Sequence, residues 1–241
     1  MGKIEAVGKE RRLQQDGLTV LSDYRDNLMP YLNLTLRVLS VAPRILEIPL
    51  FLSPKEVEHL LWMELGKRFS MRGQSAMINL EIFREDSIIL DAIYRRAADL
   101  QRVDEALLRA RDDDERPDVR GVSSLAENLE LVYYSEGQDS AIHTDFTSER
   151  ITYAPQEARF STLLLYLNEP EKGGDTSFPN WSDAESSEAL DIKPELGKAV
   201  LFYAVLPDGN LDEKSLHFSK PVVKGGKTVT NLWLWNPEDA A

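Results

Sequence analysis

Residues 129–146 read LELVYYSEGQDSAIHTDF, and they contain the first histidine of a three-residue pattern. His143 and Asp145 are separated by one residue, and His217 follows 74 positions after His143. Because side chains alternate between the two faces of a strand, His143 and Asp145 point the same way if this segment is extended. Two histidines and one carboxylate leave half of a metal's coordination sphere open, as an oxygen-using Fe(II) centre requires. The pattern predicts an enzyme whose metal ligands are His143, Asp145 and His217.

The chain after residue 120 consists of short β-type segments broken by turns. The predicted strands cover residues 128–134, 160–167, 199–204, 221–223 and 227–235, with glycine-rich turns at 173–174, 207–210 and 225–226. Before residue 120, we predict strands over 43–52 and 77–83, and helices over 54–66 and 86–111. Residues 13–40 carry mixed helical signals. This order predicts one α+β domain with a C-terminal sandwich or barrel, whose mouth is a common place for a small-molecule site.

Composition excludes several classes of partner and site. The formal net charge of −13 argues against nucleic acid and anionic membranes, which require a basic surface, and tolerates a neutral or basic peptide. The chain has no cysteine, so disulfides, thiolate nucleophiles and cysteine-ligated metals are excluded.

The same features bear on location. The lack of cysteine, and of a signal-peptide core in the first 30 residues, favours the cytoplasm. A lumenal domain of the endoplasmic reticulum whose targeting segment was removed stays open. No apolar run is long enough to cross a membrane.

Further blocks follow in a fixed order around the three candidate ligands. They are Tyr134-x-x-Gly137-Gln138, His143-x-Asp145-Phe146, Arg159-x-x-Thr162, Tyr166-Leu167-Asn168, Gly173-Gly174-x-Thr176-x-Phe178-Pro179, Pro194-x-x-Gly197-Lys198-Ala199, Pro207-Asp208-Gly209, His217, and Lys227 with Trp233. The string resembles the catalytic domain of the prolyl 4-hydroxylase family of Fe(II)/2-oxoglutarate-dependent dioxygenases. The resemblance spans about residues 43–236 and is strongest from Leu129 onward.

The resemblance implies a particular fold and domain arrangement. We expect a double-stranded β-helix, or jelly-roll, core flanked by N-terminal helices, within the α+β class. Residues 43–241 would form the dioxygenase domain. Residues 1–42 would form a helical N-terminal extension packed on that core.

The resemblance also assigns roles beyond the metal ligands. Lys227 is a point positive charge suited to a carboxylate, and its counterpart in the family binds the distal carboxylate of 2-oxoglutarate. If residues 227–235 form a strand, Lys227 and Trp233 share one face and enter the same cavity. Tyr134 and Thr176 match cofactor-binding positions, whereas Arg159 and Trp233 match positions that line the substrate site. The resemblance further implies O2 as a cosubstrate and ascorbate as the reductant.

One departure from the family pattern concerns the substrate. Peptide-hydroxylating members often have a tyrosine three residues before the first ligand histidine, where this chain has Ser140, and Asp139 and Ile142 also differ from the pattern. We therefore expect hydroxylation at C4 of a prolyl residue in a peptide or protein, with a free amino acid or another small molecule as the alternative. A non-catalytic β-barrel binding protein and a zinc hydrolase are the rival classes.

Two remaining features are interpreted as structural. The third histidine, His59, lies in the predicted helix 54–66 and is interpreted as a surface or packing residue. The acidic segment 109–118 is interpreted as a solvated loop, with a mobile flap over the site as the alternative.

Overall fold

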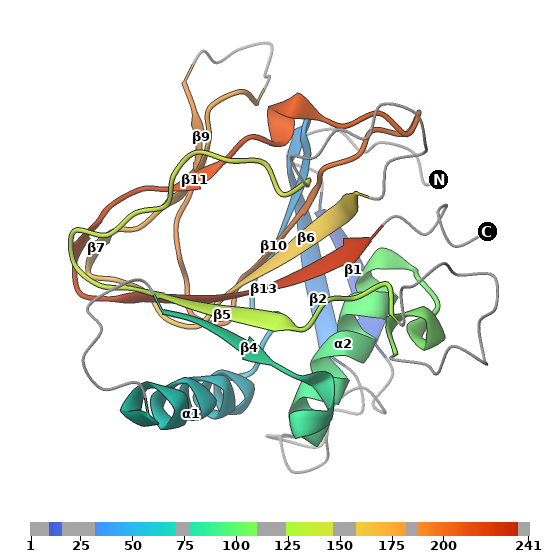
Figure 1. The fold of residues 1–241 in the computed structure, drawn as a ribbon. Coiled ribbons are helices and arrows are strands. Elements are labelled where there is room, and N and C mark those ends of the chain that lie inside the picture. The colour runs from blue at the N-terminus through green and yellow to red at the C-terminus, as the bar shows by residue number, and fades with distance from the viewer. Residues whose placement is uncertain are drawn as a thin grey trace.

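A large antiparallel sheet forms the centre of the structure. The computed structural model describes residues 10–15, 32–70, 78–109, 124–146, 158–181 and 188–235. In spatial order, the eight strands are β1 (Glu10–Gln15), β2 (Leu32–Val41), β3 (Arg44–Ile48), β10 (Ala199–Tyr203), β6 (Arg159–Tyr166), β13 (Lys227–Trp235), β5 (Leu129–Tyr134) and β4 (Ile78–Ile82) (Figure 1). Strands far apart in sequence are therefore neighbours, and β13 pairs with both β5 and β6.

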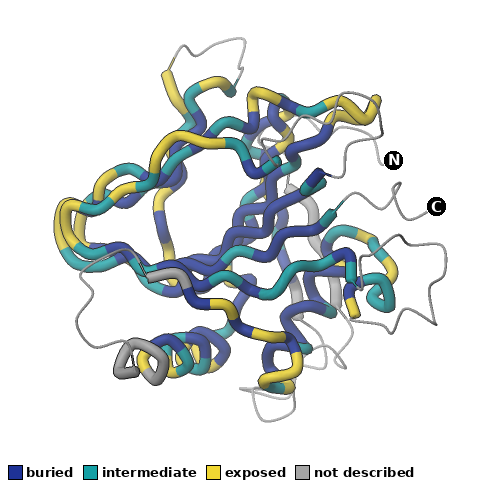
Figure 2. Tube along the Cα trace, viewed as in Figure 1, coloured by how far each residue is buried: buried dark blue, intermediate teal, exposed yellow. Residues whose placement is uncertain are grey.

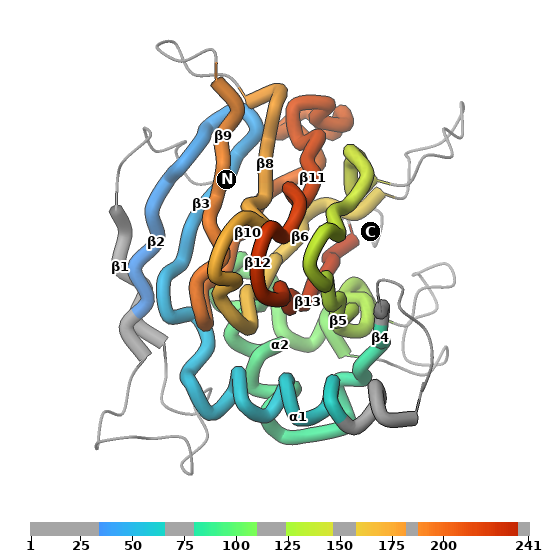
Figure 3. The backbone as a smooth tube through the Cα atoms, turned by 90° about the vertical axis from the view of Figure 1, so that its left-hand side faces the viewer, coloured from blue at the N-terminus to red at the C-terminus, as the bar shows by residue number. Residues whose placement is uncertain are grey.

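Two small sheets form a second β layer. One has the order β11 (Phe218–Ser219), β8 (Thr176–Phe178), β9 (Leu190–Ile192), and the other pairs β12 (Val222–Lys224) with β7 (Lys172–Gly173). Figure 3 views these short strands in front of the large sheet. Phe178 and Ile192 of the small sheet belong to one buried cluster with Leu164, Val200 and Phe202 of the large sheet. This mostly antiparallel arrangement is consistent with a jelly-roll.

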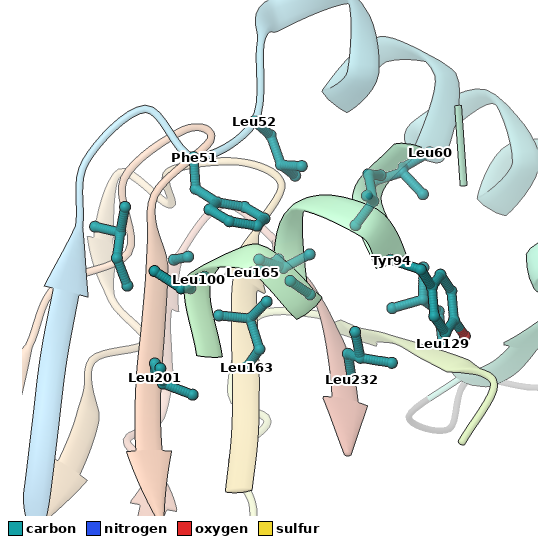
Figure 4. Close-up of a cluster of buried hydrophobic side chains, with 14 of the residues drawn as sticks. Phe51, Leu52, Leu60, Tyr94, Leu100, Leu129, Leu163, Leu165, Leu201 and Leu232 are labelled. Atoms are coloured by element: carbon teal, nitrogen blue, oxygen red, sulfur yellow. The ribbon is translucent and has the colours of Figure 1, made fainter. Parts of the chain in front are cut away.

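The helices pack against the opposite face of the large sheet. They are α1 (Pro54–Ser70) and α2 (Ile88–Gln101). Leu163 and Leu165 of β6 and Leu232 of β13 join the helices in the main hydrophobic cluster, to which α2 contributes Leu100 (Figure 4). Leu164, one position along β6, instead belongs to the cluster between the two β layers. The strand alternation thus divides the core into two compartments, and buried residues run through the central strands (Figure 2).

Both helices begin at serine caps. Ser53 Oγ accepts a hydrogen bond from the Glu56 backbone N–H at 3.3 Å, and the Glu56 carboxylate accepts one from the Ser53 N–H at 2.8 Å. Ser87 Oγ likewise accepts from the Leu90 N–H. The two-way cap between Ser53 and Glu56 and the one-way cap at Ser87 supply acceptors for backbone N–H groups that have no partner within the helix. The helix predicted over 54–66 is confirmed.

The structure corrects the expected helical N-terminal extension. The described residues of 1–42 form β1 and β2, which pair antiparallel at one edge of the large sheet. Leu34, Leu36 and Val38 are buried and alternate with less buried positions along β2. This period of two is the pattern of a strand with one buried face, and it outweighs the mixed helical propensity of the segment.

Two other expectations differ in extent. The helix predicted over 86–111 ends at Gln101, because Arg102 adopts a left-handed conformation with φ 57° and closes the helix. A short 3-10 turn, η4 (Glu105–Leu108), follows. Most of the acidic segment 109–118 lies outside the described residues. No helix in the described part of the chain is long and apolar enough to span a membrane.

A buried ion pair joins the two helices. The Arg96 guanidinium donates to the Glu56 carboxylate at 2.6 and 3.0 Å and to the Phe51 carbonyl at 2.7 Å. The exposed fractions of the Arg96 and Glu56 side chains are 1% and 5%. Removing one member of such a pair leaves an uncompensated charge in the protein interior.

We predict that Arg96→Met lowers the free energy of unfolding by about 3–5 kcal/mol, since the Glu56 carboxylate stays buried without its cation. Urea denaturation measures this loss. The matched control is Arg95→Met. It removes the more exposed ion pair between Arg95 and Asp91, and we expect it to lower the free energy of unfolding by less than about 0.5 kcal/mol. Equal losses in the two variants contradict the prediction.

Candidate metal centre

A backbone bridge brings the two distant histidines together. The His143 N–H donates to the His217 carbonyl at 2.9 Å, and the His217 N–H donates to the His143 carbonyl at 2.8 Å. The ring centroids are 4.4 Å apart. His143 lies on this isolated antiparallel bridge rather than within a longer strand, so the expected extended conformation is local.

The three predicted ligands converge. The Nε2 atoms of His143 and His217 lie 3.5 and 3.8 Å from Asp145 Oδ1. One ligand atom from each of the three residues lies within 4.8 Å of the others. An ion placed among these atoms would have three protein ligands and open positions, unlike a closed structural zinc site.

Hydrogen bonds orient each potential ligand. Nδ1 of His143 lies 2.7 Å from the Ala141 carbonyl, and Nδ1 of His217 lies 2.9 Å from the Ser215 carbonyl. Because a carbonyl only accepts, we assign the proton to Nδ1 in each ring, and each Nε2 lone pair is left for a metal. Thr162 Oγ1 donates to Asp145 Oδ2 at 2.5 Å, which leaves Oδ1 facing the histidines. Burial lowers the pKa of His217 and favours the neutral imidazole that binds a metal.

The centre opens into a cavity of about 270 Å³ between the two β layers. His143 is exposed, whereas Asp145 and His217 are 6% and 7% exposed. The metal would therefore be reached past His143 and along the cavity. Tyr134, Ser140, Thr176, Lys227 and Trp233 also line this space, with other residues of β5, β6 and β13.

Cross-strand pairs form the floor of the cavity. Lys227 of β13 pairs with Tyr134 of β5, and Trp233 pairs with Thr162 of β6. Lys227 and Trp233 both line the cavity, as the alternation of a strand predicts. Since the two residues are six positions apart, they lie about 20 Å from each other along the strand.

Lys227 is a buried cation at one end of this floor. The residue is 1% exposed, and its Nζ donates to Ser219 Oγ at 2.7 Å. Nζ also lies 5.3 Å from the Tyr134 ring centroid and 5.7 Å from that of Tyr166. No ion pair links Lys227 to any carboxylate of the described residues. Burial lowers its pKa to about 7, and a negatively charged group in the cavity would stabilise the protonated amine.

The other predicted cofactor positions surround this lysine. Thr176 is 3% exposed, and its Oγ1 accepts a hydrogen bond from the Tyr166 hydroxyl at 2.7 Å. Burial raises the pKa of Tyr134 to about 12, so its phenol keeps the proton and is available as a donor. Gly174 has φ 78°, and a Cβ there would lie 3.3 Å from the Lys227 side chain, which gives the second glycine of the Gly173-Gly174 pair a role in packing.

Ser140 occupies the position where the sequence departs from the family pattern. Its Oγ accepts from the Ser219 N–H at 2.7 Å and also hydrogen-bonds the Tyr134 side chain. Ser140 thereby connects β5 to Ser219, which in turn binds Lys227. Sequence reasoning missed Ser219 and Thr162 as supporting residues, although Thr162 stands within a recognised block and Ser219 follows His217 by two positions.

Arg159 lies behind Trp233 and does not line the cavity itself. Its guanidinium carbon is 3.9 Å from the Trp233 ring centroid. Two of its nitrogens donate to the Glu127 carboxylate at 2.6 and 2.8 Å, a contact that the sequence did not indicate. The bidentate pair with Glu127 fixes the guanidinium of Arg159, and the stacked guanidinium in turn fixes the orientation of the Trp233 indole. His59 lies on α1, where its Nε2 is 2.9 Å from Ser87 Oγ, in keeping with a packing role.

Comparison with known proteins agrees with this architecture. The 2OG-Fe(II) oxygenase superfamily matches residues 129–235. Probable prolyl 4-hydroxylase 8 of Arabidopsis thaliana is 30% identical over 210 residues, which cover 82% of this chain and 70% of that protein. Probable prolyl 4-hydroxylase 3 of the same plant is 35% identical over 120 residues, and the match spans only 42% of its length and 45% of this chain.

Solved structures share the fold at lower identity. The viral collagen prolyl hydroxylase of Paramecium Bursaria Chlorella virus-1, in its 2OG complex, superimposes with a TM-score of 0.60 at 22% identity, covering 79% of this chain and 95% of that one. A prolyl hydroxylase from Trichoplax adhaerens, in complex with a hypoxia inducible factor peptide fragment, gives 0.52 at 17% identity, with 81% and 85% coverage.

We predict that Thr162→Val weakens Mn(II) binding about 10–100-fold, because Asp145 loses the hydrogen bond that fixes its carboxylate. Calorimetric titration with Mn(II), an air-stable substitute for Fe(II), measures the change. The matched control is Thr230→Val on β13. The buried hydroxyl of Thr230 has no partner among the described residues, so we expect this variant to leave Mn(II) affinity unchanged. Equal affinity in wild type and Thr162→Val contradicts the prediction.

Proposed function

The chain belongs to the prolyl 4-hydroxylase family of 2OG-Fe(II) oxygenases, and on that premise we propose that it is a 2-oxoglutarate-dependent dioxygenase that hydroxylates an unactivated C–H bond. One observation carries the proposal. Lys227 is buried in the same cavity as the three converging ligands, and it forms no ion pair with a carboxylate of the described residues. A metal-activated water alone, as in a zinc hydrolase, gives no reason for this cation.

In this proposal, His143, Asp145 and His217 hold Fe(II). The two Nε2 lone pairs and Asp145 Oδ1 form a set of nitrogen and oxygen donors that suits a divalent first-row metal. The carbonyls of Ala141 and Ser215 keep each Nδ1 protonated, so the rings need no tautomeric change to bind.

Lys227 would bind the distal carboxylate of 2-oxoglutarate. The ammonium replaces its hydrogen bond to Ser219, or shares it, when a carboxylate enters the buried pocket. Tyr134 and Thr176 would complete this anchor, the tyrosine through its protonated hydroxyl. This fixes the far end of the cosubstrate and directs its keto acid end towards the ligands.

When bound, iron and 2-oxoglutarate supply the oxidation, in which O2 converts 2-oxoglutarate to succinate and CO2 and the substrate C–H bond becomes C–OH. The chain's residues contribute position and exclusion of water. Tyr166, Phe178 and Phe202 are each no more than 1% exposed and belong to the buried cluster between the two β layers, and Phe202 lines the cavity. Ascorbate is proposed as the reductant that restores iron after uncoupled turnover.

The proposed substrate is a prolyl residue of a peptide or protein, hydroxylated at C4. Trp233, held by Arg159, offers a flat apolar wall for a pyrrolidine ring at the end of the cavity away from Lys227. Ser140 leaves the position beside His143 without an aromatic side chain, which also admits the alternative of a free amino acid or another small molecule.

Succinate formation tests the reaction class. With Fe(II), O2 and 2-oxoglutarate, the wild type forms succinate, and Lys227→Ala raises the KM for 2-oxoglutarate at least about 30-fold because a buried carboxylate loses its cation. Lys224→Ala, at an exposed lysine nearby, is the matched control and keeps the wild-type KM. A wild-type protein that binds metal but not 2-oxoglutarate overturns the proposal.

The affinity for 2-oxoglutarate should fall with rising pH. In the free protein the pKa of Lys227 is about 7, so above pH 7 the lysine must take up a proton to pair with the carboxylate. The Kd therefore rises by about tenfold per pH unit above 7 and is flat below it. Calorimetry across pH measures this, and Lys227→Arg, whose guanidinium stays charged, removes the slope. A flat wild-type profile contradicts the prediction.

A further inference from the structure

One serine of the cavity contacts the lysine that the proposed function assigns to the cosubstrate. Ser219 Oγ accepts from Lys227 Nζ at 2.7 Å, and among the described residues it is the only hydrogen-bond partner of Nζ. Ser219 is 6% exposed and lines the cavity together with His217, two positions before it in the chain. Because two residues of an extended chain span about 7 Å, one short segment carries both a candidate metal ligand and the acceptor for Lys227.

The backbone of Ser219 is held from both sides. Its N–H donates to Ser140 Oγ at 2.7 Å, and its carbonyl accepts from the Ser140 N–H at 3.2 Å. On its other side, Ser219 of β11 pairs with Thr176 of β8. The backbone of His217 is held in a similar way by its bridge to His143. The Ser219 hydroxyl therefore has a fixed position relative to the candidate metal ligand.

The other neighbours of the Lys227 ammonium constrain its position less. A lysine carries its charge on a flexible four-carbon stem. The rings of Tyr134 and Tyr166, whose centroids lie 5.3 and 5.7 Å from Nζ, attract a cation over the whole ring face. A hydrogen bond is more directional, since it weakens steeply when its angle departs from linearity. We therefore expect the bond to Ser219 to set where along the cavity the ammonium lies.

We propose that Ser219 is a positioning residue that makes the site selective for the chain length of the keto acid. The inference rests on the proposed function, in which the metal holds the keto acid end and Lys227 holds the far carboxylate. Ser219 fixes the ammonium at one distance from the segment that carries His217. A dicarboxylic keto acid of five carbons then reaches both ends, whereas one additional methylene group displaces the far carboxylate from the ammonium.

Binding of three keto acids to the Mn(II)-loaded protein, measured by calorimetry, tests the inference. 2-Oxoadipate is one methylene group longer than 2-oxoglutarate, and 2-oxopentanoate has a methyl group in place of the far carboxylate. We expect the wild type to bind 2-oxoglutarate about 100-fold more tightly than 2-oxoadipate, a ratio within the range that one methylene group produces in a closely fitting site. In Ser219→Ala the ammonium can follow the longer acid, and we expect the ratio to fall below about tenfold.

The ratio separates positioning from other effects of the substitution. A change in the protonation of Lys227, or a general loss of stability, alters the affinity for both dicarboxylates and leaves their ratio unchanged. 2-Oxopentanoate offers Lys227 no carboxylate, so we expect its Kd to be the same in wild type and Ser219→Ala. The matched control is Ser40→Ala on β2. Ser40 is buried, its hydroxyl accepts from the Ala42 N–H, and it does not line the cavity, so this variant retains the wild-type ratio.

Two results overturn the inference alone: a wild type that binds 2-oxoadipate as tightly as 2-oxoglutarate, or a Ser219→Ala variant that keeps the wild-type ratio. If thermal denaturation shows that Ser219→Ala does not fold, Ser140→Ala takes its place, because the Ser219 N–H then loses its acceptor and the ratio should again fall. A wild type that binds 2-oxopentanoate as tightly as 2-oxoglutarate has no carboxylate anchor at Lys227. That result overturns the proposed function, and the inference with it.

Discussion

The site depends on the backbone pairing of His143 with His217. Two reciprocal N–H···O bonds join chain segments 74 residues apart and bring the imidazole rings within 4.4 Å. Nearby carbonyls fix both rings, and Thr162 fixes Asp145 from the large sheet. The ligand geometry is thus a consequence of how the two β layers meet. A displacement of either layer would separate the ligands.

On the cavity floor, one buried residue destabilises the fold instead of supporting it. Lys227 is 1% exposed and its pKa falls to about 7, so the folded chain carries a poorly solvated amine. The hydrogen bond to Ser219 and the neighbouring aromatic rings offset only part of this penalty. A ligand carboxylate would offset the rest, and groups arranged in this way are typical of binding sites.

Much of the candidate site could be predicted from sequence because its parts follow local periodicities. His143 and Asp145 share a face through a spacing of two, and Lys227 and Trp233 share one through the alternation of a long strand. The contacts that the sequence did not indicate are long-range. Glu127 reaches Arg159, and Ser219 reaches Lys227, only because non-consecutive strands are neighbours. The N-terminal strands were predicted as helix because the propensity of that segment was mixed, whereas burial along β2 decided its conformation.

The central claim is that the three ligands and Lys227 together hold Fe(II) and 2-oxoglutarate as one unit. Anaerobic titration of the Fe(II)-loaded protein with 2-oxoglutarate tests it directly, because chelation of the metal by the keto acid produces a visible charge-transfer absorption band. The account predicts a saturable band in the wild type, and no band in His217→Ala, where metal binding is lost. A wild-type protein that binds Fe(II) but develops no band at saturating 2-oxoglutarate would contradict the account.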